Sequence, residues 1–363
     1  MKGNLNIGRV LGIKIKIHWT FLFLLLWIAL EQIRSQASDE GVLFNLAFVG
    51  IVFFCVVLHE LGHASVAKRF GVQTKKITLY PIGGVASLER IPEDPKQEFL
   101  IAIAGPLVNL ILAILLYFAI PISSYTSQSF GELLISLNTF TFQNLLLYTF
   151  VANISLFVFN LIPAFPMDGG RIFRALLAMF MDRVKATRVA VVVGQFIAVL
   201  LLLIGLLYNP VLIFIALFIF ISAYGENKFV KHNALLKDHM VKEAMLTAIT
   251  TFTPKDTIKD VIDVLLTGSE TNFVIVNNDN SVAGILYRDD VIKHSKNRSK
   301  SIDEVMTKTH HPILVNSNLK EAYARLVKDK KPFFAVTDKN KLVGAIDFSN
   351  ISEFIMLESQ LHY

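Results

Sequence analysis

The sequence predicts an α-helical membrane block followed by a smaller soluble α/β unit, and three observations support this. The 363 residues are 53% hydrophobic and 18% charged, with a mean hydropathy of +0.54, whereas soluble domains carry about 25% charged residues. Long apolar stretches fill residues 17–225, and only short apolar runs occur beyond residue 240. The net charge of +6 is concentrated in particular connections, which indicates membrane orientation, and we expect no nucleic-acid partner. A single cysteine, Cys55, excludes an internal disulfide framework.

Six apolar stretches approach the roughly 20 residues that a helix needs to cross the hydrocarbon core. They are residues 17–33, 44–66, 98–120, 145–163, 187–208 and 210–225. The first sixteen residues are too polar for a signal peptide, and the stretch after them lacks a small-residue cleavage site, so we expect a retained span. Tyr208, Asn209 and Pro210 predict a tight turn that makes the last two spans a hairpin.

Lys and Arg are distributed unequally between the connections. If the N-terminus is cytoplasmic, the inner connections hold 15 of these residues, whereas the outer connections, 34–43 and 121–144, hold Arg34 alone. The loops of membrane proteins that carry an excess of Lys and Arg lie on the cytoplasmic side. The sequence therefore predicts a multi-pass protein of the cell membrane with both termini in the cytoplasm.

The chain changes in character past residue 225, where a charged segment follows the last apolar stretch. Two related segments come next, in which Met245 matches Met306 and Gly284 matches Gly344 at a period of about 60 residues. Each segment is predicted to form helix, strand, turn, strand and helix, a small soluble unit. The predicted parts are a membrane block 1–225, a linker 226–239, a first repeat 240–300 and a second repeat 301–363.

His59, Glu60 and His63 form the pattern His-Glu-x-x-His at the end of an apolar run that has no charge over residues 45–58. Residues four apart share a helix face, so both imidazoles point to one place, at a spacing that suits tetrahedral zinc with nitrogen bonds of about 2.0–2.1 Å. Glu60 lies next to that face, where it could accept a proton from a water that zinc activates. A chance match is the alternative, but ionisable groups inside an apolar span are costly, which favours a function.

A catalytic zinc site has three protein ligands and one open position, so a third ligand is needed. The acids near the inner membrane face are Glu89, Glu93, Asp94, Glu98, Asp168 and Asp182. Asp168 is favoured because Pro163 and Pro166 end the fourth span before it and two glycines free the backbone after it. Broken backbone at membrane depth is tolerated where it lines a protein cavity. The second and fourth spans both run inward, which brings His63 and Asp168 to the same membrane face; a helix cap with a solvated Asp168 is the alternative.

Residues 77–89, ITLYPIGGVASLE, predict a β-hairpin on the cytoplasmic side, because two β-prone runs flank Pro-Ile-Gly-Gly. The edge of this hairpin could pair with an unwound peptide strand. A plain surface hairpin is the alternative.

Polar residues also occur on the apolar helices. Asn153 and Asn160 are seven residues apart and share one face of the fourth span, which we expect to point into the bundle. Asn160 is a candidate to hold a peptide backbone or a developing oxyanion, whereas helix–helix contact is the preferred interpretation of Asn153. We expect Gly105 and Asn109 to serve close helix packing.

Three motifs in order, HELGH at 59–63, AGPLVN at 104–109 and NLIPAFPMDGGR at 160–171, resemble those of the site-2 protease family of intramembrane zinc metalloproteases. The two C-terminal repeats resemble tandem CBS domains, as in the branch of the family that includes the sporulation processing protease. The resemblance spans nearly the whole chain. It implies that His59, His63 and Asp168 are the ligands of one Zn²⁺ ion per chain and that Glu60 is the general base.

The same resemblance implies residues that contact the substrate. Asn160 and Pro163 match positions that the family places beside the active site. Gly83 and Gly84 match a membrane-associated loop that helps to receive the substrate as an extended strand.

The resemblance to CBS domains implies a further motif. In such pairs the second strand of a repeat ends with Gly-x-x-Ser/Thr-x-x-Asp, and the Asp of this motif holds the ribose of a bound adenine nucleotide. In the first repeat Asp290 fits this position, but Tyr287 replaces the small hydroxyl residue. In the second repeat Asp347 and Asn350 occupy the two positions, which argues against ribose binding there. An adenine nucleotide is therefore a candidate ligand at Asp290, and oligomerisation or substrate docking is the alternative role of the pair.

Taken together, the sequence predicts an α-helical polytopic membrane protein with six transmembrane helices, a cytoplasmic-side β-hairpin and a C-terminal α/β tandem CBS pair. The expected activity is zinc-dependent cleavage of transmembrane segments of membrane-tethered regulators or pro-proteins. Expected partners are the transmembrane substrate, membrane lipid and a second copy of the chain bound through the CBS domains. A CBS-gated transporter or channel is the alternative, although it predicts polar elements in two homologous halves, whereas here they converge on one three-ligand site.

Overall fold

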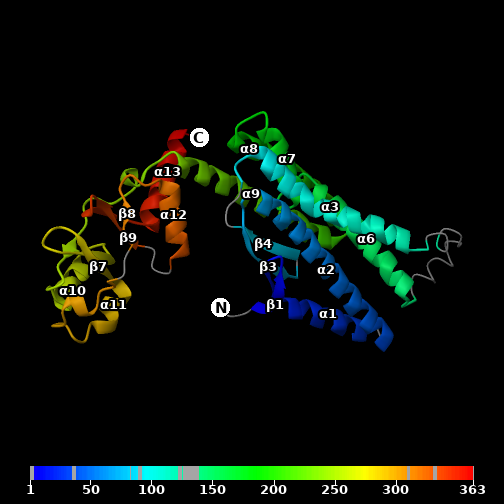
Figure 1. Cartoon of the computed structure of the whole chain (residues 1–363), viewed down its shortest axis with the longest axis horizontal. Helices are drawn as coiled ribbons and strands as arrows, with labels where there is room; N and C mark the ends of the chain where they lie inside the picture. The colour runs from blue at the N-terminus through cyan, green and yellow to red at the C-terminus, as the bar shows by residue number, and fades with distance from the viewer. Residues whose placement is uncertain are drawn as a thin grey trace. The chain divides into compact units, whose positions relative to one another are not determined.

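A computed structural model of the chain describes residues 4–34, 38–81, 83–88, 92–121, 125, 139–308, 311–329 and 333–362 (Figure 1). It divides into two compact units, Met1–Lys228 and Phe229–Tyr363. Most of the predicted outer connection 121–144, together with Glu89 of the predicted hairpin, lies outside the described residues.

The first unit combines long apolar helices with a small sheet. In chain order its elements are β1 (Asn4–Val10), β2 (Ile13–His18), α1 (Phe21–Arg34), α2 (Asp39–Arg69), β3 (Thr74–Tyr80), β4 (Gly83–Leu88), α3 (Pro95–Ala119), α6 (Phe142–Leu161), α7 (Asp168–Ala178), α8 (Arg183–Leu207) and the start of α9 (Pro210–Lys237). Five of these helices, α2, α3, α6, α8 and α9, are long and apolar enough to cross a membrane by length and composition. The fold class is therefore as predicted.

The predicted count of six spans is not confirmed. The first expected span, 17–33, overlaps α1, which has only 14 residues, short of the roughly 20 that a crossing requires. Ile17 and His18 belong instead to strand β2, because Ile13, Ile15 and Ile17 alternate with polar residues at the two-residue period of a strand.

The predicted β-hairpin is present as β3 and β4, which pair antiparallel from Tyr80–Gly83 outward. It is part of a larger sheet with the strand order β1-β2-β3-β4, in which β2 runs parallel to β3. The β1–β2 hairpin is a feature that the sequence analysis does not predict. Apolar side chains of β2 and β3, including Ile15 and Ile77, pack against Leu61 and Ala64 of α2. This packing holds the sheet beside the helix that carries the His-Glu-x-x-His pattern.

Helix α3 is central to the first unit, since it packs against α2, α6 and α7 (Figure 1). Contact between α2 and α3 is close at Gly62, where an added Cβ would lie 2.8 Å from the Ala104 carbonyl oxygen. Small residues allow such close approach of helix backbones in apolar surroundings.

As predicted, α6, which corresponds to the fourth expected span, ends before Pro163. The residues after Asp168 are not loose backbone, however, because they form helix α7. An added Cβ on Gly169 would lie 2.2 Å from the Ile162 carbonyl oxygen, and one on Gly170 would lie 2.8 Å from Ala164. The two glycines therefore allow the backbone of the preceding loop to pack directly against the start of α7.

Helix α9 is continuous from Pro210 to Lys237, through most of the segment expected as a linker. The second unit then contains β5 (Thr251–Phe252), α10 (Ile258–Thr267), β6 (Asn272–Val276), β7 (Val282–Tyr287), α11 (Arg288–His294), β8 (Ile313–Leu314), α12 (Leu319–Lys328), β9 (Phe333–Asp338), β10 (Lys341–Asp347) and α13 (Phe348–His362), with 3-10 turns at Val241–Glu243 and Ile302–Glu304. The predicted order of helix, strand, strand and helix occurs in both repeats, and a short strand precedes each.

The start of each repeat crosses onto the sheet of the other. Leu246 exchanges backbone hydrogen bonds of 2.8 and 3.0 Å with Ala345 of the second repeat, and Thr307 does the same with Ile285 of the first, at 2.9 and 3.1 Å. The repeated glycines make room for these crossings. An added Cβ on Gly344 would lie 2.3 Å from the Leu246 carbonyl oxygen, and one on Gly284 would lie 2.9 Å from that of Thr307.

We predict that Gly344→Ala destabilises the second unit, because its methyl group would collide with the backbone of Leu246. The free energy of unfolding should fall by about 1–3 kcal/mol, as for other overpacked sites. Pulse proteolysis in urea, scored on fragments of residues 229–363, measures this change in the full-length protein. Gly225→Ala is the control, since no atom lies within 4 Å of its added Cβ. Equal stability of the Gly344→Ala and wild-type proteins would contradict the crossing.

Candidate active site

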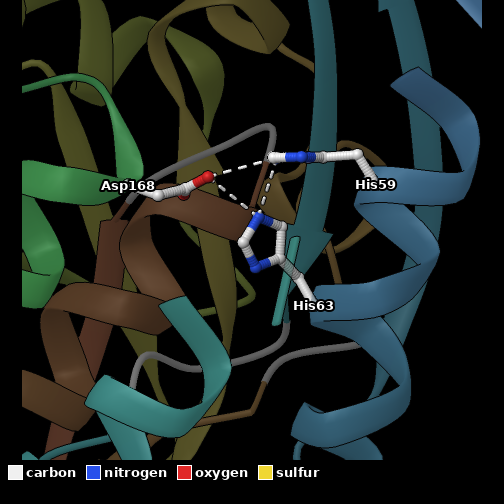
Figure 2. Close-up of side chains that lie close together, drawn as sticks. All are labelled: His59, His63 and Asp168. Carbon is white, nitrogen blue, oxygen red and sulfur yellow. Dashed lines mark hydrogen bonds and ion pairs between the residues drawn. The ribbon is translucent and has the colours of Figure 1, made fainter. Parts of the chain in front are cut away.

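His59 and His63 on α2 meet Asp168, the first residue of α7 (Figure 2). The two histidine Nε2 atoms are 3.1 Å apart, and each lies 3.1 Å from Oδ2 of Asp168. The residues are almost covered, with 7% of His59 and 9% of His63 exposed. Three side chains that can ligate a metal thus converge from two helices, as the inward course of the second and fourth predicted spans led us to expect.

The Nδ1 atom of each histidine, on the side of the ring away from the cluster, is hydrogen-bonded to an oxygen. His63 Nδ1 lies 2.7 Å from the carbonyl oxygen of Ile101, and His59 Nδ1 lies 2.5 Å from Oδ1 of Asn109. A carbonyl oxygen can only accept, so each Nδ1 donates its proton, and a neutral ring then presents a lone pair at Nε2. Two lone pairs and a carboxylate oxygen therefore face one another, which is unfavourable unless a cation lies between them.

The arrangement fits zinc. Ligand atoms of a tetrahedral ion with bonds of about 2.05 Å are separated by about 3.3 Å, and the three separations here are 3.1 Å. The donor set of two imidazoles and one carboxylate is one that catalytic zinc uses, with a fourth position left for water or substrate.

Asn109 was expected to serve helix packing, but its side chain contacts the candidate metal site. Its Nδ2 donates to Oδ1 of Asn153 at 2.9 Å, and Asn153 in turn donates to the carbonyl oxygen of Thr149 at 2.9 Å and lies 3.4 Å from Cys55 Sγ. This buried chain of amides fixes which atom of Asn109 faces His59. Asn153 is the helix–helix link that was predicted, and Cys55 is a buried thiol outside the three-residue cluster.

Gly105 is likewise more than a packing residue. An added Cβ there would lie 2.2 Å from His63 Nε2 and 2.7 Å from His59 Nε2. The backbone of α3 thus covers the two rings directly, and any side chain at this position would occupy the place of the imidazoles.

Glu60 lies on α2 beside the histidines and against strand β4. An added Cβ on Gly84 would lie 2.8 Å from Cγ and 3.2 Å from Oε1 of Glu60. Strand β4 is the outer strand of the order β1-β2-β3-β4. The candidate base and an outer strand edge are therefore neighbours.

Asn160 and Pro163 lie at the end of α6, where both are partly buried. In the part of the chain that the structure describes, no hydrogen bond joins the Asn160 side chain to His59, His63 or Asp168. They border the loop that leads to Asp168.

Most of the other candidate acids have structural roles. Asp94 and Asp182 accept backbone N–H groups as the N-caps of α3 and α8. Glu98 is paired with Arg174 and Arg183. Glu89 lies outside the described residues.

The candidate nucleotide site in the second unit has an acidic character. Asp290 lies in the first turn of α11, next to half-buried Tyr287. Burial raises the pKa of Tyr287 to about 12, and the carboxylates of Asp329 and Asp290 contribute further. In the second repeat, Asp347 accepts the backbone N–H of Asn350, whose side chain accepts that of Asp347. That pair is thus engaged in capping α13.

Comparison with known proteins gives a consistent result. The family model described as Peptidase family M50 matches residues 47–204, and that described as CBS domain matches residues 241–297. Zinc metalloprotease MJ0392 of Methanocaldococcus jannaschii is 35% identical over 355 residues, which cover 97% of this chain and 96% of that protein. Stage IV sporulation protein FB of Bacillus subtilis is 33% identical over 134 residues, 37% of this chain and 41% of that protein. A solved site-2 protease from M. jannaschii is 38% identical, covers 62% of this chain and 95% of its own, and has a TM-score of 0.45.

We predict that Gly105→Ala removes most of the bound zinc, because its methyl group displaces both imidazoles. Zinc per chain, measured by atomic spectrometry on the purified protein, should fall about tenfold or more, the range for disturbed metal ligation. Gly50→Ala is the control, since Gly50 lies on α2, the helix that carries both histidines, with no atom within 4 Å of its added Cβ. Circular dichroism should give equal helix content for both variants. Full zinc content in folded Gly105→Ala would contradict the placement of the rings.

Proposed function

We propose that this chain, which belongs to peptidase family M50, cleaves the transmembrane segment of a membrane-tethered regulator or pro-protein. It is a site-2 type zinc metalloprotease and a multi-pass membrane protein with five membrane-capable helices. The observation that carries the proposal is the convergence of His59, His63 and Asp168 at the end of apolar helix α2. The transporter or channel considered as an alternative is not favoured, because the family is one of peptidases.

We assign His59, His63 and Asp168 as the zinc ligands. The support is their near-equal separations of 3.1 Å and the two oxygen acceptors behind the rings. When bound, zinc supplies Lewis acidity, which lowers the pKa of a water to about 7 and polarises the scissile carbonyl group. Asn109 and the Ile101 carbonyl keep the two imidazoles in the tautomer that offers Nε2.

Glu60 is proposed as the general base. It is adjacent to His59 on α2, and its side chain lies close to the backbone of Gly84. In this role it takes a proton from the water that attacks the scissile carbonyl carbon. It then delivers that proton to the amide nitrogen as the C–N bond breaks, so that a carboxylic acid and an amine leave.

The substrate is proposed to lie along β4. A peptide bond inside a transmembrane helix is protected by its own hydrogen bonds, so the substrate must unwind, and an outer strand edge satisfies the freed groups by β-augmentation. Gly83 and Gly84 suit this role, since at Gly84 the strand approaches Glu60 without a side chain between them. Asn160 and Pro163 are proposed to border the same substrate at the end of α6.

The orientation and the second unit are part of the proposal. The excess of Lys and Arg in the inner connections favours cytoplasmic termini, with release of the product toward the cytoplasm. We propose that the CBS pair of residues 240–300 and 301–363 regulates the protease or assembles it into oligomers, after a connection at 226–239. Ribose binding is proposed at Asp290 alone, since Asp347 and Asn350 are engaged with each other.

We predict opposite phenotypes for two variants. Glu60→Gln should abolish cleavage while zinc content stays at one ion per chain, because the ligands are intact and only the proton acceptor is lost. Asp168→Ala should lower both zinc content and cleavage, since a site with two histidines binds zinc far more weakly. Zinc content is measured by atomic spectrometry. Cleavage is measured on membrane proteins that co-purify with Glu60→Gln and are identified by mass spectrometry.

Two outcomes would contradict these assignments. Cleavage of a trapped substrate by Glu60→Gln at the wild-type rate would exclude Glu60 as the base. Full zinc content in Asp168→Ala would mean that another group completes the site. Glu93→Gln serves as the matched acid control, since Glu93 lies in the segment before α3 and outside the three-residue cluster.

We predict that an adenine nucleotide, if it is a ligand of the CBS pair, binds through Asp290. Calorimetry of the full-length protein with AMP and with ATP measures this directly. Asp290→Ala should abolish the heat of binding, whereas Asn350→Ala should leave it unchanged. Absence of binding to the wild-type protein would leave oligomerisation or docking as the role of the pair.

A further inference from the structure

A buried guanidinium joins three separate segments of the first unit. Arg174 on α7 is 1% exposed, and its Nε lies 3.0 Å from Oε1 of Glu98 on α3. Its Nη1 donates to Glu226 on α9, and its Cζ lies 5.0 Å from the ring centroid of Phe165, in the loop before α7. One side chain thus connects α3, α7, α9 and the loop that leads to Asp168.

The charges in this cluster balance. Arg183 Nη2 lies 3.2 Å from the second oxygen of Glu98, so two guanidinium groups face two carboxylates, those of Glu98 and Glu226. A buried charge is strongly unfavourable without such partners. The cost of separating them ties the positions of α3, α7 and α9 to one another.

Arg174 is well placed to set the position of Asp168. It follows Asp168 by six residues on the same helix, about 9 Å along the axis. Phe165, beneath the guanidinium, precedes Asp168 by three residues. The Arg174 guanidinium therefore fixes both α7, which begins at Asp168, and the loop that precedes Asp168. Among the described interactions, Asp168 itself does not contact this guanidinium.

Glu226 brings in a helix that also belongs to the second unit. Helix α9 continues from Pro210 to Lys237, and Leu235 and Leu236 near its end are buried in the core of the second repeat with Ile313 and Leu319. Glu226 itself belongs to the first unit, where it contacts Arg174.

We propose that Arg174 is a positioning residue for Asp168 and that its contact with Glu226 makes the geometry of the metal site depend on helix α9. The proposal rests on the proposed function, because it takes Asp168 as a zinc ligand. In this arrangement a displacement of α9 alters the Arg174 cluster first and the third ligand next. A purely structural role would instead stabilise the bundle and leave the ligand geometry unchanged.

The test measures metal binding as well as folding in the full-length protein. The variants are Arg174→Lys, which keeps the charge but cannot bridge two carboxylates in a fixed plane, Glu226→Ala, and the double variant. Arg188→Met on α8 is the control, because Arg188 is exposed. Zinc affinity is measured by competition with a chelator, and the visible spectrum of the Co²⁺-substituted protein reports the ligand geometry.

We expect Arg174→Lys to weaken zinc binding about tenfold, in the range of outer residues that orient ligands. Glu226→Ala should weaken it by a smaller factor, and both should alter the Co²⁺ spectrum. The double variant should be no weaker than Arg174→Lys, because residues that act through one contact are not additive. If Arg174→Lys does not fold, Glu226→Ala carries the test alone, since it leaves the Arg174–Glu98 pair in place.

Three results would overturn the proposal. One is wild-type zinc affinity and an unchanged Co²⁺ spectrum in folded Glu226→Ala and Arg174→Lys. The second is strict additivity in the double variant, which would mean that Glu226 does not act through Arg174. The third is an equal loss in Arg188→Met. Failure of the proposed function is distinguishable, because it would appear as full zinc content in Asp168→Ala.

Discussion

The site depends on one electrostatic constraint, the convergence of three electron-pair donors in apolar surroundings. Oxygen acceptors behind His59 and His63 direct both Nε2 lone pairs toward Asp168, at 3.1 Å from one another and from its carboxylate. Without a cation such a cluster would be unfavourable, because buried acceptors need partners. A metal ion held by these residues, as proposed, would reverse this and link α2 to α7, so that metal binding and assembly of this part of the fold would support each other.

Helix α3 supplies much of what surrounds the cluster. Glu98, Ile101, Gly105 and Asn109 follow one another at intervals of three or four residues and therefore share one face. Along this face the helix presents a carboxylate to Arg174, a carbonyl oxygen to His63, a bare backbone to both rings and an amide to His59. The Glu98 carboxylate, the Ile101 carbonyl and the Asn109 amide on this face thus each have a partner, as burial at membrane depth requires.

The CBS pair is stabilised in a different way, by backbone hydrogen bonds that each repeat makes with the sheet of the other. The start of each repeat pairs with the last strand of the other, and Gly284 and Gly344 provide the space. The repeat of methionine and glycine in the sequence has its physical reason here, because Met245 and Met306 pack over these glycines. Since helix α9 also contributes Leu236 to the core of the second repeat, that repeat includes the end of a membrane-capable helix.

The sequence by itself determined the membrane block, the two C-terminal repeats, the β3–β4 hairpin and the candidate cluster. Hydrophobic length, a 60-residue period and the four-residue spacing of His59 and His63 are local properties, and such patterns can be read without a fold. The contacts of Asn109, Gly105 and Arg174 could not be read in this way. Each appears as an ordinary helix residue, or as one more positive charge, until α3, α7 and α9 are packed together. The partner of His59 Nδ1 is Asn109, 50 positions away in the chain, and only the tertiary structure decides such a pairing.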